Sequence, residues 1–427
     1  MLAPLDKKNT DSQPQKSFLV GIHLPEEDST DAQNLLAELR ELVGTLGLEY
    51  AGSELVHLRE AHAQLLIGSG KADEIIRKAK ATNANVLVFD HELSPAQQRN
   101  WEKRSGLVVI DREEVILDIF ASRTRTREAR LQIGLAQMEY SLPRLTRAWG
   151  HLSRQRGAAN LRGEGESQLE VDRRLVRRRI DKFRSELRHV KDVRATQRKQ
   201  RLRLPTPTAA IVGYTNAGKS SLLRALTNAE VHVEDKLFAT LDPTTRRLIF
   251  PDNSTLLITD TVGFVRKLPH RLIEAFKATL EEAVMSTFLI HVVDASSSEA
   301  LAHHATTLEV LRELGADQKN ILTVFNKMDL VPDASHVAHL RSQFPQALFV
   351  SIRTGEGMEC LHHRLHEMAR PDTVRLSLRL PHTRYDLVSQ MHKSGRVYSE
   401  NYTEHGIEAE ASIPARLAGA FQPFAIA

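Results

Sequence analysis

The sequence predicts a multidomain α/β protein: an N-terminal α/β domain, an antiparallel basic helical arm, a larger α/β domain that begins with a glycine-rich loop, and a small α+β C-terminal domain. Three observations support this fold class. The chain of 427 residues is too long for one compact core. Buried-strand patterns alternate with helix-length stretches in two separate parts of the chain. Between these parts, the apolar residues of a long segment follow a helical period.

The N-terminal α/β domain is expected over residues 18–112, after a polar tail of residues 1–17 that we expect to be disordered. The runs "FLVGIHL" and "NVLVFD" are typical of buried strands. Between them, Leu35, Leu39 and Leu42 recur at helical spacing after a Ser/Thr/Asp start. This alternation predicts a parallel sheet covered by helices.

The helical arm is expected over residues 113–204. Residues 121–203 contain 23 Lys and Arg against 9 Asp and Glu, so this segment carries +14 and the rest of the chain −10. A solvated helix normally mixes both signs, so this imbalance favours binding to a polyanion over a role in solubility alone. Two narrow apolar seams predict two packed helices joined by the glycine-rich tip 156–167. The seams are Leu131, Leu135, Met138 and Leu142, then Leu169, Val176, Ile180, Phe183, Leu187 and Val190.

A larger α/β domain is expected over residues 205–371, where strand patterns recur between helix-length stretches. Its strands include "TAAIVG", "STLLITD", "TFLIHVVD" and "NILTVFN". Residues 372–427 alternate strand and helix patterns, which predicts the small α+β domain.

The strongest chemical signal follows the first strand of this larger domain, where residues 213–220 match G-x-x-x-x-G-K-[ST]. In such a P-loop, glycines let backbone amides surround phosphate oxygens, and the helix that follows adds its positive end. The lysine reaches the β- and γ-phosphates and the serine binds Mg²⁺. We therefore expect a nucleotide to bind at Gly213, Tyr214, Thr215, Asn216, Ala217, Gly218, Lys219 and Ser220.

Three further motifs follow in the order found in GTPases. In Asp260-Thr261-Val262-Gly263, the carboxylate can hold Mg²⁺ through its water shell while the glycine amide meets the γ-phosphate. In Asn326-Lys327-Met328-Asp329, the aspartate can accept two hydrogen bonds that guanine donates and adenine cannot. Ser351-Ile352-Arg353 stands where a weaker guanine-side loop is expected. The sequence therefore predicts a P-loop GTPase that binds GTP and GDP.

A switch segment, "LFATLDPTTR" at residues 237–246, lies between the first two motifs. One of its threonines must offer a hydroxyl to Mg²⁺ when the γ-phosphate is present, and loss of that contact after hydrolysis would release the segment. Thr240, Thr244 and Thr245 are all candidates by chemistry.

These motifs, together with "FATLDPTTR", "DTVGF" and the arm sequence "RGAANLRGEGESQLE", resemble the HflX family of ribosome-associated GTPases over essentially the whole chain. The resemblance implies that Thr240 is the Mg²⁺ ligand of the switch, beside Ser220. It implies binding to the large ribosomal subunit, and splitting or rescue of stalled ribosomes under stress. It places the arm tip at the peptidyl-transferase centre. It also implies that the nucleotide contacts Phe238, Ala239, Thr240, Leu241 and Asp242.

The tip also has a chemistry of its own. Arg154, Arg156 and Arg162 can pair with phosphates or stack on unpaired bases of ribosomal RNA. The alternative is an ordinary disordered connector.

Lys219, Thr240 and Gly263 are the candidate catalytic residues. Phe264 follows the second motif, where Ras-like enzymes place a glutamine that orients the attacking water. We therefore expect slow intrinsic hydrolysis that a partner stimulates. The alternative is that Phe264 only packs as a lid while another residue orients the water. Asn216 suggests a K⁺ site as a second hypothesis, because similar potassium-activated GTPases place a cation-ligating asparagine there.

Two other functions share these motifs. A ribosome-assembly GTPase would bind immature particles in preference to mature ribosomes. A GTP-gated RNA-binding protein would bind free RNA and would not be strongly stimulated by ribosomes.

Cys360 is the single cysteine and cannot form an internal disulfide, which is typical of a reducing compartment. No apolar run reaches the roughly 20 residues of a membrane span. We expect a cytoplasmic monomer without a membrane span; a peripheral membrane fraction is an alternative location.

Two weaker signals complete the sequence. "GSGK" at residues 68–71 looks like part of a second phosphate loop, but Leu65 replaces its first glycine and Ala72 its Mg²⁺ ligand. The pair His303 and His304 completes no metal-site spacing, and we expect both to be surface residues.

Overall fold

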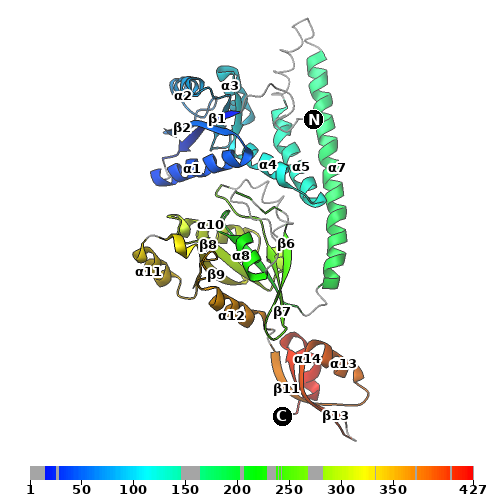
Figure 1. Ribbon diagram of the computed structural model, residues 1–427. Coiled ribbons are helices and arrows are strands. Elements are labelled where there is room, and N and C mark those ends of the chain that lie inside the picture. The colour runs from blue at the N-terminus through cyan, green and yellow to red at the C-terminus, as the bar shows by residue number, and fades with distance from the viewer. Residues whose placement is uncertain are drawn as a thin grey trace.

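A computed structural model describes most of the chain. The described residues are 15–25, 28–145, 164–201, 206–227, 237–238, 240–241, 243–267, 282–331, 333–370, 373–403 and 406–426; side chains of 164–169 and 191–201 are outside this description. Three sheets follow one another along the chain, and the C-terminal domain lies at the far end of the molecule from the N-terminal sheet (Figure 1). Within the described ranges, none of the helices combines the length and apolar character needed to cross a bilayer.

The N-terminal domain is a four-stranded parallel sheet in the order β2-β1-β3-β4. Its strands are β1 Lys16–His23, β2 Glu49–His57, β3 Val86–Phe89 and β4 Val108–Asp111. Its helices are α1 Ser29–Leu46, α2 Ser69–Ala81 and α3 Pro95–Ser105. β1 is buried on both faces: Leu19 lies in one core with Leu39 of α1, and Val20 lies in another with Ile75 of α2 and Trp101 of α3. Helices therefore cover both faces of this sheet, as the strand and helix patterns predict.

The helical arm follows this sheet. It consists of α4 Arg112–Arg123, α5 Arg127–Ser141, the 3₁₀ turn η1 Leu142–Arg144 and the long α7 Glu164–Arg201. α5 approaches α7 closely at Gly134, where an added Cβ would lie 3.3 Å from the ring of Phe183. Nearby, Glu139 pairs with Arg184 at 2.7 Å. The predicted RNA-contact residues Arg154, Arg156 and Arg162 lie outside the described residues.

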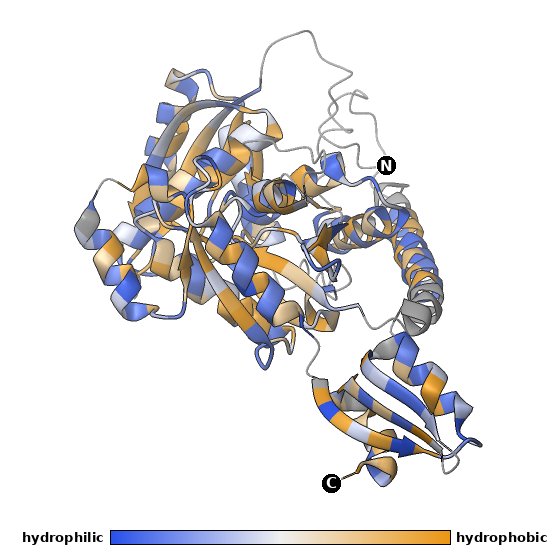
Figure 2. Cartoon of the chain, turned by 60° about the horizontal axis from the view of Figure 1, so that its bottom comes forward, coloured by the Kyte–Doolittle hydropathy of each residue, from blue (hydrophilic) through white to orange (hydrophobic). Residues whose placement is uncertain are grey.

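The P-loop domain is built on a six-stranded sheet in the order β10-β9-β8-β5-β7-β6, in which only β6 runs antiparallel to its neighbour. Its strands are β5 Thr208–Gly213, β6 Thr244–Ile249, β7 Thr255–Asp260, β8 Phe288–Asp294, β9 Asn320–Asn326 and β10 Leu348–Phe349. Its helices are α8 Lys219–Thr227, α10 Ala300–Glu313, α11 Ala334–Gln343 and α12 Met358–Ala369, with the turn η2 Met328–Leu330. Figure 2 shows hydrophobic residues along the central strands and hydrophilic ones on much of the helical surface. Parallel strands end at one edge, so Gly213, Asp260 and Asn326 are brought together there.

The C-terminal domain is a three-stranded antiparallel sheet in the order β11-β13-β12. It contains β11 Thr373–Leu380, α13 Tyr385–Ser394, β12 Arg396–Thr403, β13 Gly406–Pro414, α14 Ala415–Phe421 and η3 Gln422–Phe424. Leu378, Met391 and Phe421 are fully buried between the sheet and its helices. The predicted α+β fold of this part is therefore confirmed by its own core.

Candidate nucleotide site and its contact with the N-terminal domain

Two glycines shape the loop between β5 and α8. Gly213 has φ +147° and Gly218 has φ +96°, conformations that side chains rarely adopt. A Cβ on Gly213 would lie 2.2 Å from the carbonyl oxygen of Val292, and one on Gly218 would lie 2.3 Å from Nδ2 of Asn326. The loop therefore packs its backbone directly against neighbouring strand ends and directs the start of α8 toward the space above it.

Lys219 is the first residue of α8 and is 94% buried. Its Nζ donates to the carbonyl oxygen of Tyr214 at 2.7 Å. Burial lowers the pKa of Lys219 to about 8, and the nearby carboxylate of Asp260 opposes this shift. A buried ammonium at the edge of the sheet is suited to an anionic ligand, because a second negative charge would restore its usual pKa.

Three side chains bring their oxygen atoms together beside Lys219. Ser220 Oγ donates to Asp260 Oδ2 at 2.6 Å, Thr240 Oγ1 donates to the same oxygen at 2.8 Å, and the two hydroxyls are 2.7 Å apart. The other oxygen of Asp260, Oδ1, is buried with no hydrogen-bond partner among the described residues. Hydroxyl and carboxylate oxygens are the ligands that Mg²⁺ prefers, so the residues fit this ion.

The structure distinguishes the three threonines of the first switch segment, residues 237–246. Thr240 reaches Ser220, whereas Thr244 and Thr245 lie in β6. Thr245 contacts Thr259 of the neighbouring strand at 2.9 Å. Chemistry alone left the choice open and the resemblance implied Thr240, which is the threonine that lies beside Ser220 and Asp260.

The second switch segment, residues 260–267, runs along the P-loop. A Cβ on Gly263 would lie 2.8 Å from Lys219 Nζ and 2.8 Å from Cα of Thr215, so this position accepts only glycine. The amide of Phe264 donates to Gly213 O at 3.1 Å, and the amide of Thr215 donates to Phe264 O at 2.8 Å. The phenyl ring is 2% exposed. It packs as a buried apolar group.

The guanine-side motifs are held together at the carboxyl end of β9. Asn326 Nδ2 donates to Ala217 O at 2.9 Å, and its Oδ1 accepts from the amide of Ile352 at 3.3 Å. Asp329 accepts from Ser351 Oγ at 2.6 Å. These bonds tie the P-loop, the Asn326–Asp329 motif and the loop after β10 into one rigid edge.

A cavity of about 440 Å³ opens over this edge. The predicted residues that line it are Thr215, Asn216, Gly218, Lys219, Ser220, Phe238, Thr240, Thr261, Gly263, Asn326, Lys327, Asp329, Ile352 and Arg353. The cavity is not lined by eight other predicted residues, Gly213, Tyr214, Ala217, Leu241, Asp260, Val262, Met328 and Ser351, while Ala239 and Asp242 lie outside the described residues. Ser221 and Leu330 also line the cavity and were not singled out in the sequence.

The side chain of Tyr214 points away from the cavity and into the N-terminal domain. Its hydroxyl donates to Glu38 of α1 at 2.5 Å and accepts from the amide of Arg266 at 2.9 Å. Arg112 donates to the same Glu38 at 2.5 Å and to the carbonyl oxygen of Arg266 at 3.0 Å. A buried polar network therefore joins the P-loop and the second switch segment to the N-terminal domain.

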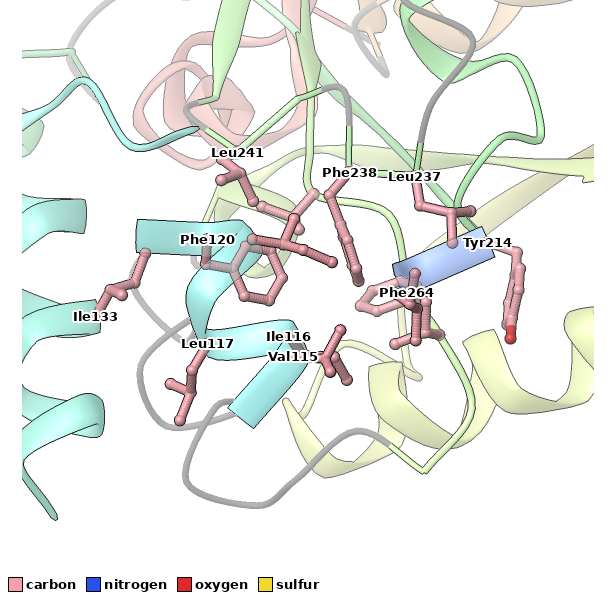
Figure 3. Close-up of a cluster of buried hydrophobic side chains, with 14 of the residues drawn as sticks. Val115, Ile116, Leu117, Phe120, Ile133, Tyr214, Leu237, Phe238, Leu241 and Phe264 are labelled. Atoms are coloured by element: carbon pink, nitrogen blue, oxygen red, sulfur yellow. The ribbon is translucent and has the colours of Figure 1, made fainter. Parts of the chain in front are cut away.

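Apolar residues of both switch segments enter the same interface (Figure 3). Phe238, Leu241 and Phe264 belong to one continuous buried cluster that also contains Ile116 and Phe120 of α4. The rings of Phe120 and Phe238 are 4.5 Å apart. Sequence reasoning missed this interface. The available signal was the presence of large apolar residues in segments that only need polar groups to bind a nucleotide.

The expectation that His303 and His304 are surface residues is wrong. The ring of His303 stacks on Tyr214 with centroids 3.8 Å apart, and His304 stacks on the fully buried His291 at 4.7 Å. Both residues lie on the face of α10 that packs on the sheet and the P-loop. Burial lowers the pKa of both histidines.

Comparisons with known proteins cover most of the chain. Family models described as GTP-binding GTPase N-terminal, GTP-binding GTPase Middle Region and 50S ribosome-binding GTPase match residues 33–121, 123–201 and 208–327. The chain is 49% identical to a protein named GTPase HflX from Akkermansia muciniphila, with 94% of each chain covered. It is 41% identical to GTPase HflX from Escherichia coli, covering 93% of this chain and 90% of that protein.

Among solved structures, a GTP-binding protein from Sulfolobus solfataricus in complex with GDP matches with 24% identity and a TM-score of 0.44. The match covers 83% of this chain and 98% of that one.

Proposed function

Because the chain belongs to the HflX family of GTPases and hydrolyses GTP to GDP and phosphate, we propose that its GTP form binds the large ribosomal subunit and splits or rescues stalled ribosomes under stress. The observation that carries this proposal is the pairing of a complete P-loop site with a strongly basic helical arm, net +14 over residues 121–203. One family model that matches the P-loop domain describes a 50S ribosome-binding GTPase. On this proposal the protein acts as a monomer in the cytoplasm, where ribosomes are found.

The P-loop side of the cavity would bind the phosphates. Lys219 would contact the β- and γ-phosphates, and Gly263 of the second switch segment lines the same cavity, where its amide would meet the γ-phosphate. Ser220 and Thr240 would hold Mg²⁺, with Asp260 acting through its water shell. When bound, Mg²⁺ neutralises charge that develops on the phosphate oxygens. The oxygens that already converge there make Ser220 and Thr240 a consistent pair of ligands.

The guanine side of the cavity would select the base. Asp329 lines the cavity while Ser351 and Arg353 hold its carboxylate, at 2.6 Å and 3.7 Å respectively. A carboxylate fixed in this way can accept both donors of guanine, N1–H and the exocyclic amine. Asn216, which also lines the cavity, is the residue we propose for K⁺, and equal turnover in KCl and NaCl would remove that role.

The ribosome would complete the catalytic site. Phe264 is buried and has no group that could orient an attacking water by hydrogen bonding. A group supplied by a partner can accelerate such a reaction by roughly 10³ to 10⁵. We therefore propose slow intrinsic hydrolysis that large subunits stimulate.

The arm would contact ribosomal RNA. On α7, Val171 and Leu175 are exposed among arginines, at 40% and 50% of their surface, so a stripe of this helix is available to a partner. Arg154, Arg156 and Arg162 of the tip are the proposed contacts with phosphates and bases.

Sedimentation tests this proposal directly. The protein would be mixed with large or small ribosomal subunits and either a non-hydrolysable GTP analogue or GDP, then pelleted. We expect co-sedimentation with large subunits and the GTP analogue, and separation of intact ribosomes into subunits in a sucrose gradient. Preference for immature particles would favour an assembly GTPase instead. Equal binding to any free RNA would favour the RNA-binding alternative.

A further inference from the structure

We propose that Arg123, which belongs to the N-terminal part of the chain, is a positioning residue for GTP hydrolysis. Arg123 holds the first switch segment so that Thr240 stays beside Ser220 and Asp260. This inference rests on the GTPase site and on Thr240 as a Mg²⁺ ligand; it does not depend on the ribosome.

Arg123 contacts the switch backbone directly. Its Nη1 donates to the carbonyl oxygens of Leu237 and Phe238, at 2.9 Å and 2.8 Å. Leu237 precedes Thr240 by three residues and Phe238 by two. A charged donor shared by two consecutive carbonyls fixes the orientation of the peptide unit between them, because both oxygens must point at one nitrogen.

Phe238 needs such support. It has φ +56°, which is unfavourable for a residue with a side chain and is kept only where the surroundings impose it. Its ring is 2% exposed and packs 4.5 Å from the ring of Phe120. Phe120 and Arg123 are three residues apart on α4, so one helical face holds both the ring and the carbonyl of Phe238.

The opposite end of the same helix contacts the other switch segment. Arg112, the first residue of α4, donates to the carbonyl oxygen of Arg266 at 3.0 Å. A helix of this length spans roughly 16 Å between its first and last residues. α4 is therefore a rigid strut that touches the first switch segment at one end and the second at the other.

The position of this strut is itself fixed. Arg112 is bound by Glu38 at 2.5 Å and by Asp90 at 3.0 Å, and all three side chains are buried. Glu38 also accepts from the Tyr214 hydroxyl of the P-loop. Helix α4 is thus anchored to the P-loop through Glu38 and extends Arg123 to the first switch segment. Thr240 meets Ser220 at 2.7 Å in this arrangement.

The test compares Arg123→Ala and Arg123→Lys in the full-length protein, with Arg104→Ala as the matched control. Arg104 is an exposed arginine of α3, the helix that precedes α4 in the chain, and its described ion pair is with Asp73. The first readout is release of a fluorescent GTP analogue at low and high Mg²⁺ and in EDTA. We expect Arg123→Ala to release the nucleotide about tenfold faster in Mg²⁺, because the substitution removes a charged hydrogen bond to the switch. Release in EDTA should be unchanged, because Thr240 then has no metal ion to hold.

Hydrogen exchange and turnover give independent readouts. Amide exchange of the peptide over residues 237–241 should rise in Arg123→Ala, and kcat should fall about tenfold with a higher Mg²⁺ requirement. Arg123→Lys keeps one charged donor and should recover part of each effect, and it remains informative if the alanine variant does not fold. Two results would overturn the proposal: unchanged Mg²⁺ dependence and exchange in both variants, or faster hydrolysis, which would make the contact a restraint on the switch.

Discussion

Two glycine-lysine turns begin helices at parallel sheets of this chain, but only one of them has the geometry of a phosphate site. In the P-loop, Gly213 and Gly218 are required because a Cβ would lie 2.2 Å and 2.3 Å from neighbouring atoms. At the start of α2, a Cβ on Gly68 would lie 3.8 Å from Nε2 of His62, and one on Gly70 would meet no atom of the described residues within 4 Å. At the start of α2, close packing of the backbone therefore does not require glycine.

The two lysines differ in the same way. Lys71 forms ion pairs with Glu54 at 2.7 Å and with Glu74 at 3.0 Å. These hydrogen bonds raise the pKa of Lys71, whereas burial lowers the pKa of Lys219 to about 8. The charge of Lys71 is already neutralised by carboxylates, while that of Lys219 faces a cavity. Sequence letters that suggest a phosphate loop are thus informative only when the surrounding structure leaves the lysine available.

The largest effect that would sharpen this comparison is expected from Lys219→Ala. The substitution removes the only charge in the P-loop, so we expect GTP turnover to fall by at least about 100-fold, the value of one strong charge-assisted contact. Steady-state phosphate release measures this. Retention of more than a tenth of the activity would mean that Lys219 is not the phosphate contact.

A change in base preference is expected from Asp329→Asn. An amide offers one acceptor and one donor, which match the N1–H and the C2 carbonyl of xanthine instead of the two donors of guanine. We expect GTP affinity to fall about 100-fold and XTP affinity to rise, as measured by competition with a fluorescent nucleotide. Parallel losses for both nucleotides would indicate a structural defect at this edge of the sheet.

Acid should destabilise the P-loop sheet through one buried histidine. In the P-loop sheet, His291 of β8 is fully buried and neither ring nitrogen has a hydrogen-bond partner among the described residues. Burial lowers its pKa to about 3, with His304 and Lys219 adding to the shift.

The sign follows from proton binding. Below pH 6.5 the unfolded chain protonates His291 and the folded chain does not, so stability is lost as the pH falls from 6.5 toward 3. At pH 5 the free energy of unfolding is lower by about 2 kcal/mol because of His291. We expect His291→Leu to lose less of its free energy of unfolding than the intact protein when the pH falls from 6.5 toward 3, as measured by urea unfolding at a series of pH values. Equal losses in both proteins would contradict this account.

The smallest effect is expected from Lys71→Ala. A partly exposed ion-pair network contributes little, so the free energy of unfolding should fall by less than about 1 kcal/mol. GTP turnover and nucleotide affinity should change less than about twofold, as is usual for a substitution on the protein surface away from the site. A tenfold loss of affinity for any nucleotide would break the comparison and make the start of α2 a second phosphate site.

The parts of the site that were predicted from sequence are those whose functional residues lie close together in the chain. Residues 213–220 fix a loop because their glycines, lysine and serine are adjacent, and Asp260 and Asn326 follow recognisable strands. The strand patterns likewise match β5, β7, β8 and β9. Spacing within one segment was enough to predict these features.

The contacts between domains could not be predicted in this way. Arg123 and Phe238 are 115 residues apart, and Glu38 and Tyr214 are 176 apart. No periodicity links such pairs, because their meeting depends on how α4 and α1 dock on the P-loop domain. Chemistry alone did not choose among Thr240, Thr244 and Thr245, since all three carry the same hydroxyl, and only the family resemblance implied Thr240.

GTP turnover with and without purified large ribosomal subunits tests the central claim most directly. The intact protein would be compared with a variant in which Arg154, Arg156 and Arg162 are replaced by alanine. In the control variant, three exposed arginines of the N-terminal domain, Arg77, Arg99 and Arg104, are replaced by alanine. We expect strong stimulation of the intact protein and the control, and a much weaker response when the tip arginines are missing. Turnover that large subunits do not change in any of the three proteins would contradict a GTPase whose catalytic site the ribosome completes.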